Sequence, residues 1–244
     1  MAVLQGVDFT VNPGEIFVIM GPSGCGKSVL LRQLIGLEIP DQGEILIDSQ
    51  PVQAPDLTTR YRVAMVFQSG ALLTSMTVGE NVGFYLSEHH LKPPAEIAAI
   101  VARDLAEVGL AGTQKKMPDE LSGGMRKRVA IARALAIEPQ LIFYDEPTSE
   151  LDPLSAVNIA EDILKLNTRT HATSVIVTHD RDLASGLAQR IAMLEEGRII
   201  AIGTPTVIWG NPDPRVQQFL QARIAPATSI LDAGQAWPSS RGQI

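Results

Sequence analysis

The stretch "GPSGCGKS" at residues 21–28 constrains the fold of this chain more than any other. It follows an apolar run, "EIFVIM" (15–20), and precedes a segment with helical periodicity. This is the strand–loop–helix context of a phosphate-binding loop, or P-loop. Glycines there let successive backbone N–H groups approach a phosphate that side chains would keep away. We therefore expect a β-phosphate at the positive end of a helix that begins near Lys27.

The residue types within this loop predict separate roles. Lys27 is expected to reach the β- and γ-phosphate oxygens, and Ser28 to ligate Mg²⁺. Cys25 occupies a free position of the loop, where a space-filling role is favoured over a nucleophilic one, although alkylation there should block nucleotide entry. The residues predicted to bind the nucleotide are Gly21, Pro22, Ser23, Gly24, Cys25, Gly26, Lys27 and Ser28.

Composition narrows the class of protein. A chain of 244 residues is long enough for one large α/β domain, with or without a subdomain. Its single cysteine excludes internal disulfides and Cys-based zinc clusters, which favours a reducing compartment. A net charge of −7 argues against a broad nucleic-acid-binding face, so we expect no nucleic-acid partner. We find no secretory signal and no apolar run near the roughly 18 residues of a membrane span, so a membrane role is expected to come through a partner.

Short apolar runs rich in β-branched residues predict the strands of a mainly parallel, buried sheet. The strands are expected at 15–20, 44–47, 63–67, 141–144, 174–178, 191–194 and 198–202. The helices are expected at 28–36, 79–87, 94–109, 124–136, 154–167, 181–189 and 213–223. We predict one α/β domain over 1–223 with a helical subdomain at about 71–137, and a C-terminal segment, 224–244, that is a frayed tail rather than a docking segment built on Trp237.

Two adjacent carboxylates end a predicted strand in "LIFYDEP" (141–147). Neighbouring residues on a strand point to opposite faces, so two carboxylates in a row serve two targets only where the strand gives way to a turn, which Pro147 supplies. Asp145 is expected to hold Mg²⁺ beside the P-loop, and Glu146 to orient and polarise the attacking water.

Two further polar residues follow predicted strands. Gln68 comes just after 63–67, where its amide is expected to reach Mg²⁺ or the attacking water. His179 comes directly after 174–178, where a structural hydrogen bond is the alternative to a catalytic role. His89 and His90 have no other metal-ligating residue type near them in the sequence and are interpreted as solvated.

The stretch "LSGGMRKR" (121–128) carries three cations in four residues but no group for acid–base or nucleophilic chemistry. Together with "GPSGCGKS", Gln68, "LIFYDEP", "SELD" (149–152) and His179, it occurs in the order and approximate spacing found in ABC transporters. Over roughly residues 2–223 the chain resembles their nucleotide-binding subunit. The resemblance implies a P-loop NTPase core of the α/β class, with a mainly parallel sheet, an antiparallel β portion and a helical subdomain.

The resemblance also implies how the motifs work together. Two subunits would pair head to tail as a homodimer, each ATP lying between the P-loop of one and the "LSGG" signature of the other, and hydrolysis would drive an integral membrane permease. Glu146, His179 and Gln68 would form the catalytic set, and Ser28, Gln68 and Asp145 the Mg²⁺ ligands. Asp152 would join the nucleotide-binding residues.

The signature stretch fits this role physically. Ser122, Gly123 and Gly124 stand at the start of a predicted helix, so their N–H groups and the serine hydroxyl form a second anion site for a γ-phosphate. This site has no lysine of its own aimed into the loop, so a second copy must complete it, and dimerisation should depend on ATP. The cations that follow, Arg126 to Arg128, form either a solvated helix face or a support for the phosphate or the subunit interface.

Finer features resemble one branch of the family. "LSGGMRKR", "FQSGALLTSMTVGENVGF" (67–84) and "DPRVQQFL" (213–220) are similar to the ATPases of MCE-associated lipid transporters, the Mla-type phospholipid systems of bacterial envelopes. The implied partners are a permease, an MCE-domain lipid-binding protein and a small cytoplasmic regulator, with the ATPase on the cytoplasmic face of the inner membrane. The alternatives are a non-transport ABC ATPase that acts as a regulatory or scaffold module, and an ABC subunit for a different substrate.

Two departures from the family pattern stand out. Family members carry an aromatic residue upstream of the P-loop strand whose ring stacks on adenine. This sequence begins "MAVLQGVDF", which we expect to lie after that position, and Phe9 is expected to lie too close to the core strand to replace it. Glu150 stands where the pattern has a small residue, and its carboxylate would either repel phosphate or pair with a cation across the interface.

Overall fold

A six-stranded sheet forms the centre of the molecule. The computed structural model describes residues 3–52 and 60–222. Five strands run parallel, and the last strand is antiparallel to its neighbour, so the predicted mainly parallel sheet with an antiparallel portion is confirmed. In spatial order the strands are β4 (Val63–Val66), β5 (Leu141–Asp145), β6 (Thr173–Thr178), β1 (Ile16–Met20), β7 (Arg190–Glu195) and β8 (Arg198–Gly203).

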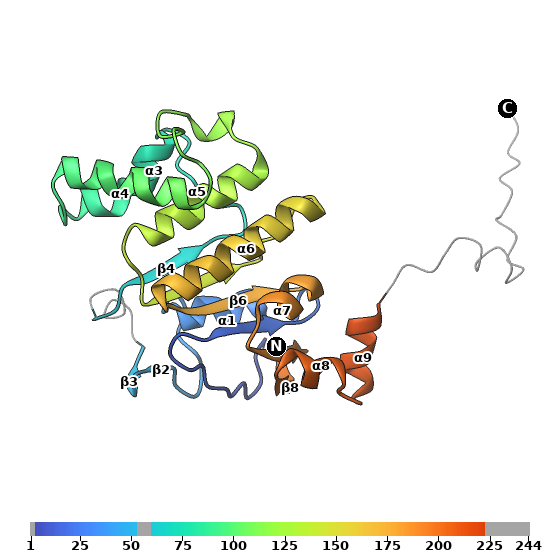
Figure 1. The fold of residues 1–244 in the computed structure, drawn as a ribbon. Helices are drawn as coiled ribbons and strands as arrows, with labels where there is room; N and C mark the ends of the chain where they lie inside the picture. The colour runs from blue at the N-terminus through green and yellow to red at the C-terminus, as the bar shows by residue number, and fades with distance from the viewer. Residues whose placement is uncertain (1–2, 53–59, 223–244) are drawn as a thin grey trace, which may run out of the picture.

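Helices cover both faces of this sheet (Figure 1). Helix α1 (Lys27–Leu34) packs on one face, against β5 and β6. The opposite face is covered by α5 (Gly123–Leu135), α6 (Pro153–Thr170) and α7 (Arg181–Leu187), with two further helices packed beyond α5. The remaining helices are α3 (Val78–Glu88), α4 (Pro94–Glu107), α8 (Pro205–Trp209) and α9 (Pro214–Gln221), with a 3₁₀ turn at Pro118–Glu120.

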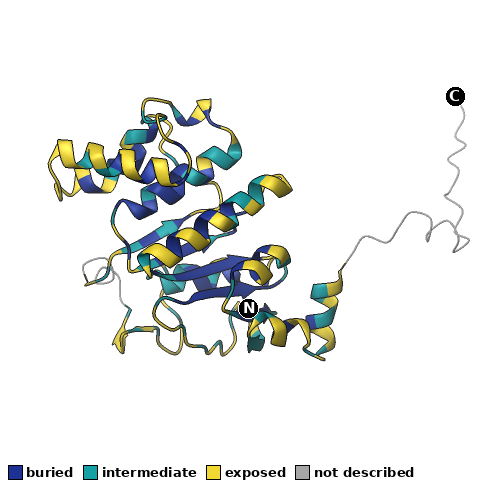
Figure 2. Ribbon diagram, in the orientation of Figure 1, coloured by how far each residue is buried: buried dark blue, intermediate teal, exposed yellow. Residues whose placement is uncertain are grey.

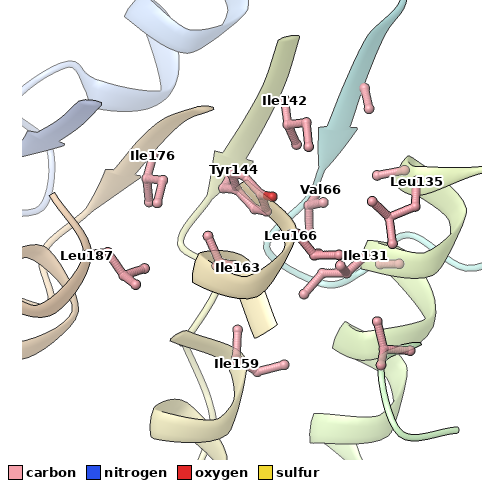
Figure 3. Packing of buried hydrophobic residues seen from close by; sticks show 14 of the residues in the cluster. Val66, Ile131, Leu135, Ile142, Tyr144, Ile159, Ile163, Leu166, Ile176 and Leu187 are labelled. Atoms are coloured by element: carbon pink, nitrogen blue, oxygen red, sulfur yellow. The ribbon is translucent and has the colours of Figure 1, made fainter. Parts of the chain in front are cut away.

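Alternation along the strands divides the core into two layers. Val18, Ile142 and Tyr144 face the α5–α6 layer, whereas Phe17 and Phe143 face α1. Consecutive strand residues point to opposite faces, which is why a run of apolar residues supplies both layers. Figure 2 shows the resulting buried sheet between half-exposed helices. Figure 3 shows the larger layer, whose labelled members are Val66, Ile131, Leu135, Ile142, Tyr144, Ile159, Ile163, Leu166, Ile176 and Leu187.

One expected core strand is wrong. Of the predicted strand 44–47, only β2 (Leu46–Ile47) forms, and it pairs antiparallel with β3 (Gln50–Pro51) in a separate hairpin. Asp48 and Ser49 both take a positive φ, +49° and +63°, which closes a tight two-residue turn. Leu46 stays exposed, because this short ribbon lies outside the six-stranded sheet.

One helix is missing from the predicted set, and one prediction lies outside the described residues. Helix α8 begins at Pro205 after the cap Thr204, whose hydroxyl accepts a hydrogen bond from the Val207 N–H at 3.4 Å. Three helices, α3, α4 and α5, fall within 71–137. The division into a domain over 1–223, a helical subdomain and a tail stays a prediction, and 224–244 with Trp237 lies outside the described residues.

Candidate functional site

The strand order brings the sequence motifs to one edge of the sheet. In the parallel register, Val66 of β4 lies beside Tyr144, Asp145 beside Val177, and Thr178 beside Met20. The loops that leave β4, β5, β6 and β1 at their carboxyl ends therefore emerge side by side, in the place where open α/β sheets bind ligands.

The P-loop supplies a cradle between β1 and α1. A Cβ on Gly21 would lie 2.0 Å from the carbonyl oxygen of Leu194, so only glycine fits there. Gly24 and Gly26 have φ values of +81° and +109°, in the region that disfavours side chains. Gly26 caps α1 without any side-chain hydrogen bond to the first amides of the helix. Those N–H groups point out of the helix end, which suits an anion such as a phosphate.

Lys27 lies buried within this loop. Its Nζ donates hydrogen bonds to the carbonyl oxygens of Gly21, at 2.8 Å, and Pro22, at 3.0 Å. The same Nζ lies 3.8 Å from Oε1 of Glu146, an ion pair between the P-loop and the loop after β5. The ammonium is thus held close to the backbone that would surround a phosphate, with the proposed general base as its nearest carboxylate.

Cys25 is a core residue of the loop. Its side chain is 6 % exposed and belongs to the layer that packs on α1. Burial raises the pKa of its thiol above the usual range, partly offset by the charge of Lys27. Because the thiolate is the reactive species, this position favours the space-filling interpretation over the nucleophilic one.

Glu146 is the most strongly constrained carboxylate at this edge. Its backbone has a φ of +46°, a left-handed conformation directly before Pro147. Its Oε1 lies 2.9 Å from Nδ1 of His179, and its Oε2 accepts hydrogen bonds from the Thr178 hydroxyl at 3.0 Å and the His179 N–H at 3.2 Å. The side chain is 12 % exposed, so its direction is fixed by these contacts. The structure therefore brings Glu146, His179 and Lys27 together.

Thr178 is a site residue that the sequence reasoning did not name. It is fully buried, donates to Glu146, and its hydroxyl oxygen accepts a hydrogen bond from the Asp180 N–H at 3.0 Å. Asp180 also accepts a bond from the Thr148 hydroxyl at 2.9 Å, which ties the loop after β6 to the loop after β5. Thr178 belongs to the stretch "VTHD", which also contains His179. A threonine at the end of a strand is common, and only the pairing of β5 with β6 brings this one next to Glu146.

The residues expected to ligate Mg²⁺ provide hard oxygen donors. Asp145 ends β5, and burial together with the neighbouring Glu146 charge raises the pKa of its carboxyl. Ser28 and Gln68 are exposed, on α1 and after β4 respectively. A hydroxyl, an amide and one carboxylate match the way Mg²⁺ is bound when phosphate oxygens complete its shell. Within 3–52 and 60–222, no cluster of three or more His, Cys, Asp or Glu side chains forms a metal site by itself.

The signature lies on the other face of the sheet from α1. Ser122 is exposed and caps α5, and its hydroxyl accepts a hydrogen bond from the Met125 N–H at 3.3 Å. A Cβ on Gly124 would lie 3.6 Å from Oγ of Ser155, so the start of α5 lies against the start of α6. Asp152 caps α6 and accepts hydrogen bonds from the Ser155 N–H, at 3.0 Å, and its hydroxyl. Asp152 therefore lies close to the signature. Gly123 is near the same loop, since a Cβ on Gly123 would lie 3.7 Å from Cδ2 of Leu151.

A wide hollow lies elsewhere in the described part of the chain. It has a volume of about 2100 Å³ and is bordered by the N-terminal segment, the β2–β3 ribbon and the amino ends of the strands. None of the candidate nucleotide-binding or catalytic residues borders it. The ring of Phe9 stacks on that of Phe17, with centroids 5.2 Å apart, in agreement with the interpretation that Phe9 belongs to the core.

A P-loop between a parallel strand and a helix, with an acidic strand end beside it, defines the class of P-loop nucleotide hydrolases. Within that class the chain belongs to the ABC transporter family, whose model matches residues 4–149. The chain is the ATP-binding, ATP-hydrolysing subunit of such a transporter.

Curated relatives extend the similarity over most of the chain. The intermembrane phospholipid transport system ATP-binding protein MlaF of Escherichia coli K12 is 43 % identical over 222 residues, which cover 89 % of this chain and 82 % of that protein. The probable ribonucleotide transport ATP-binding protein mkl of Mycobacterium tuberculosis H37Rv is 40 % identical over 251 residues, 95 % of this chain and 70 % of that protein.

Solved structures show the same fold. A bacterial ABC transporter cassette, MJ0796, solved as a dimer, is 34 % identical with a TM-score of 0.75, over 83 % of this chain and 90 % of that chain. A second structure of that cassette, a dimer in a post-hydrolysis state bound to ADP and Pi, has a TM-score of 0.74.

Proposed function

We propose that this chain works as a head-to-tail homodimer that hydrolyses Mg²⁺-ATP to drive a membrane permease carrying phospholipid or a similar hydrophobic molecule. The observation that carries the proposal is the pair of half-sites: the P-loop at the carboxyl ends of the strands, and an exposed second anion site at Ser122 on the other face. Each half-site has backbone donors for phosphate, and the P-loop half-site also has the buried ion pair between Lys27 and Glu146.

The chemistry follows from the groups around Glu146. When bound, Mg²⁺ would neutralise charge on the β- and γ-phosphate oxygens, held by Ser28, Asp145 and Gln68. Lys27 would bind the same oxygens. Glu146 would accept the hydrogen bond of the attacking water, and His179 and Thr178 would hold its carboxylate in place, since both already contact it.

The test of this assignment is the variant Glu146→Gln in the assembled transporter. The amide keeps the size of the side chain but loses the basic oxygen, so ATP should still bind and turnover should fall by about 10² or more. Lys27→Ala should fail earlier, at nucleotide binding. Wild-type hydrolysis by the Glu146→Gln complex would remove Glu146 from the role of general base.

The permease-binding surface is proposed at the loop after β4 and at α3. Phe67, Leu73 and Tyr85 are all more than a third exposed there. Large apolar side chains that stay exposed along this segment favour a protein partner there. No helix of the described residues is long and apolar enough to cross a membrane. Because the proposed partner is a permease, we place the ATPase on the cytoplasmic face of the inner membrane, held there through that partner.

This surface can be tested by co-purification. Tyr85→Asp should abolish recovery of a multi-spanning permease with the ATPase, because it places a charge in the proposed interface. Val207→Asp is the matched control: Val207 is also exposed, but it lies on α8, at the opposite end of the molecule (Figure 1). Equal recovery of the permease with both variants would contradict the proposed surface. Full function of the ATPase without any membrane partner would instead favour the non-transport alternative.

The substrate class is proposed from the similarity to MlaF, the ATP-binding protein of an intermembrane phospholipid transport system, whereas the relative mkl is named for ribonucleotide transport. An MCE-domain lipid-binding protein and a small cytoplasmic regulator are proposed as further partners. ATP hydrolysis by the complex reconstituted in vesicles should rise when phospholipid is the offered substrate and stay at its basal rate with ribonucleotides. Stimulation by ribonucleotides alone would reverse the assignment.

A further inference from the structure

The three cations of the signature helix have different surroundings. Arg126 is exposed, and its guanidinium donates to the Leu121 carbonyl at 2.7 Å within the same segment. Arg128 forms an ion pair with Asp162 of α6 at 2.9 Å. Lys127 is only 5 % exposed, so the expectation of one solvated cationic face does not hold for it.

The Lys127 ammonium joins α5 to two loops of the nucleotide site. Its Nζ donates to the backbone carbonyl of Gln68, to the carbonyl of Glu146 at 3.2 Å, and to the hydroxyl oxygen of Ser149 at 3.2 Å. An ammonium has three donors and no acceptor, so these contacts use its full capacity. Two of the three acceptors belong to the residues whose side chains are proposed to bind Mg²⁺ and the attacking water.

The Glu146 carbonyl is the centre of this arrangement. It accepts hydrogen bonds from the Ser149 N–H at 3.1 Å and the Ser149 hydroxyl at 2.8 Å, in addition to Lys127. A residue with a φ of +46° persists only where its surroundings fix it. Lys127 is therefore one of the groups that hold Glu146 in its left-handed conformation, and with it the direction of the carboxylate.

Nearby carboxylates act on the charge of the Lys127 ammonium, although none in the described part of the chain forms a direct ion pair with it. Burial lowers the pKa of the ammonium, while the nearby carboxylates of Glu150, Glu146 and Asp145 act against this. Glu150 is exposed, with a φ of +64°, and its charge acts on a cation of its own chain. Keeping a cation away from water costs free energy that an apolar residue would avoid, so this position has a role other than filling space.

We propose that Lys127 is a positioning residue that couples the signature helix to the catalytic loops of its own chain. The inference rests on the proposed function. Ser122 at the start of α5 would bind the phosphate held by a second copy, and Lys127, five residues along the same helix, holds Gln68 and Glu146 of the first copy. A shift of α5 on dimer closure would then move the backbone of both catalytic loops, so that each ATP site senses whether the other has closed.

The first experiment is Lys127→Met in the full chain, which keeps the length of the side chain and removes all three hydrogen bonds. Steady-state hydrolysis should show kcat reduced about tenfold or more, the effect of losing hydrogen bonds to a charged group, while KM for ATP changes little because the P-loop is untouched. Lys127→Gln, which retains an N–H₂ donor, should recover part of kcat. Wild-type kcat in Lys127→Met would overturn the proposal.

A matched variant separates positioning from loosening of the helix. Arg128→Met breaks the contact of the next residue of α5 with Asp162 of α6 and should lower the melting temperature without lowering kcat at 25 °C. If Arg128→Met lowers kcat as much as Lys127→Met, the effect is general destabilisation and the proposal fails. Should Lys127→Met not fold, the comparison of Lys127→Gln with Arg128→Met decides the same question.

A double variant separates positioning from direct support of the partner's phosphate. Glu146→Gln with Lys127→Met should still dimerise on ATP, as is expected of Glu146→Gln alone, because the signature amides remain. Loss of that dimer would contradict positioning and favour a phosphate-binding role for Lys127. The assignment of Glu146 as general base, on which this inference rests, fails if Glu146→Gln alone retains wild-type hydrolysis, an outcome that the Lys127 variants do not affect.

Discussion

Asp104 shows how one buried carboxylate affects the stability of the whole helical layer. Its side chain on α4 is fully buried, and Oδ1 accepts a hydrogen bond from the Arg103 guanidinium at 2.8 Å. Its Oδ2 has no hydrogen-bond partner in the described part of the chain. Burial raises the pKa of this carboxyl, because removal from water disfavours the charged form.

The stabilising effect of Asp104→Asn should depend on pH. The folded protein holds the Asp104 proton to a higher pH than the unfolded chain does, so the carboxyl destabilises the fold progressively as pH rises from the unfolded pKa through the folded pKa. The melting temperature of Asp104→Asn relative to wild type should therefore be more favourable at about pH 8 than at about pH 4, which is close to the pKa of an aspartate in the unfolded chain. Asp119→Asn, at an exposed carboxylate, is the control; an equal difference at both pH values for Asp104→Asn would contradict the assignment.

At the scale of residues, the sequence predicted those functional groups that can be recognised from their immediate neighbours in the chain. The P-loop glycines, Lys27 and Glu146 carry their signal in spacing and in the adjacent strand. Thr178 was not named, and Lys127 was named only as part of a cationic run with two open interpretations, because their roles depend on which loops lie side by side. A lysine in a basic run is ordinarily solvated, and only the packing of α5 on β4 turns Lys127 inward.

At the scale of elements, the loop from 67 to 77 is held by side chains of two helices. Asn81 of α3 is fully buried; its amide donates to three carbonyls, including that of Leu73 at 3.0 Å, and accepts from the Leu73 N–H at 2.7 Å. Arg133 of α5 donates to the carbonyls of Gly70 and Ala71 at 2.8 and 2.7 Å. The loop that carries Gln68 therefore moves with α3 and α5.

Two substitutions at the start of α3 should lower the free energy of unfolding by different amounts. Asn81→Asp keeps the shape but turns an amide donor into a carboxylate facing three carbonyl oxygens, so it should cost about 3 kcal/mol or more of unfolding free energy. Thr77→Ala removes the capping box formed with Glu80 and should cost about 1 kcal/mol. Urea unfolding midpoints measure both, and an Asn81→Asp protein as stable as Thr77→Ala would contradict the described network.

The bounds of several elements next to the P-loop, the acidic strand end and the signature were predictable, whereas the fate of 44–47 and of 204–209 was not. β1, β5 and α5 agree with the predicted ranges within one residue at each end, since each combines a clear period with a cap or turn. The run 44–47 has the composition of a core strand, but four residues cannot specify which sheet they join. In "TPTVIW" (204–209), β-branched residues masked a helix whose Thr–Pro start was the better signal.

At the scale of the whole molecule, the two proposed phosphate-binding ends belong to helices on opposite faces of the sheet. The alternating strand residues that separate the two core layers also place α1 and α5 on opposite sides. The strand order 4-5-6-1-7-8 that gathers the catalytic loops is a property of long-range pairing, which the sequence pattern alone did not provide. A single chain would thus present two different half-sites. In a dimer with two-fold symmetry, the P-loop of each chain would face the signature of the other chain, which would form two complete sites.

Mixing two defective variants tests this composite site. In a Glu146→Gln background, which should retain the ATP-bound dimer, Lys27→Ala disables the P-loop and Ser122→Arg blocks the signature, so neither protein alone should dimerise with ATP. A mixed dimer would contain one intact P-loop facing one intact signature, since each ATP uses halves from different chains. Analytical ultracentrifugation with ATP should therefore detect dimers only in the mixture. If both halves of a site came from one chain, the mixture would contain no intact site and would stay monomeric, which would exclude the head-to-tail arrangement.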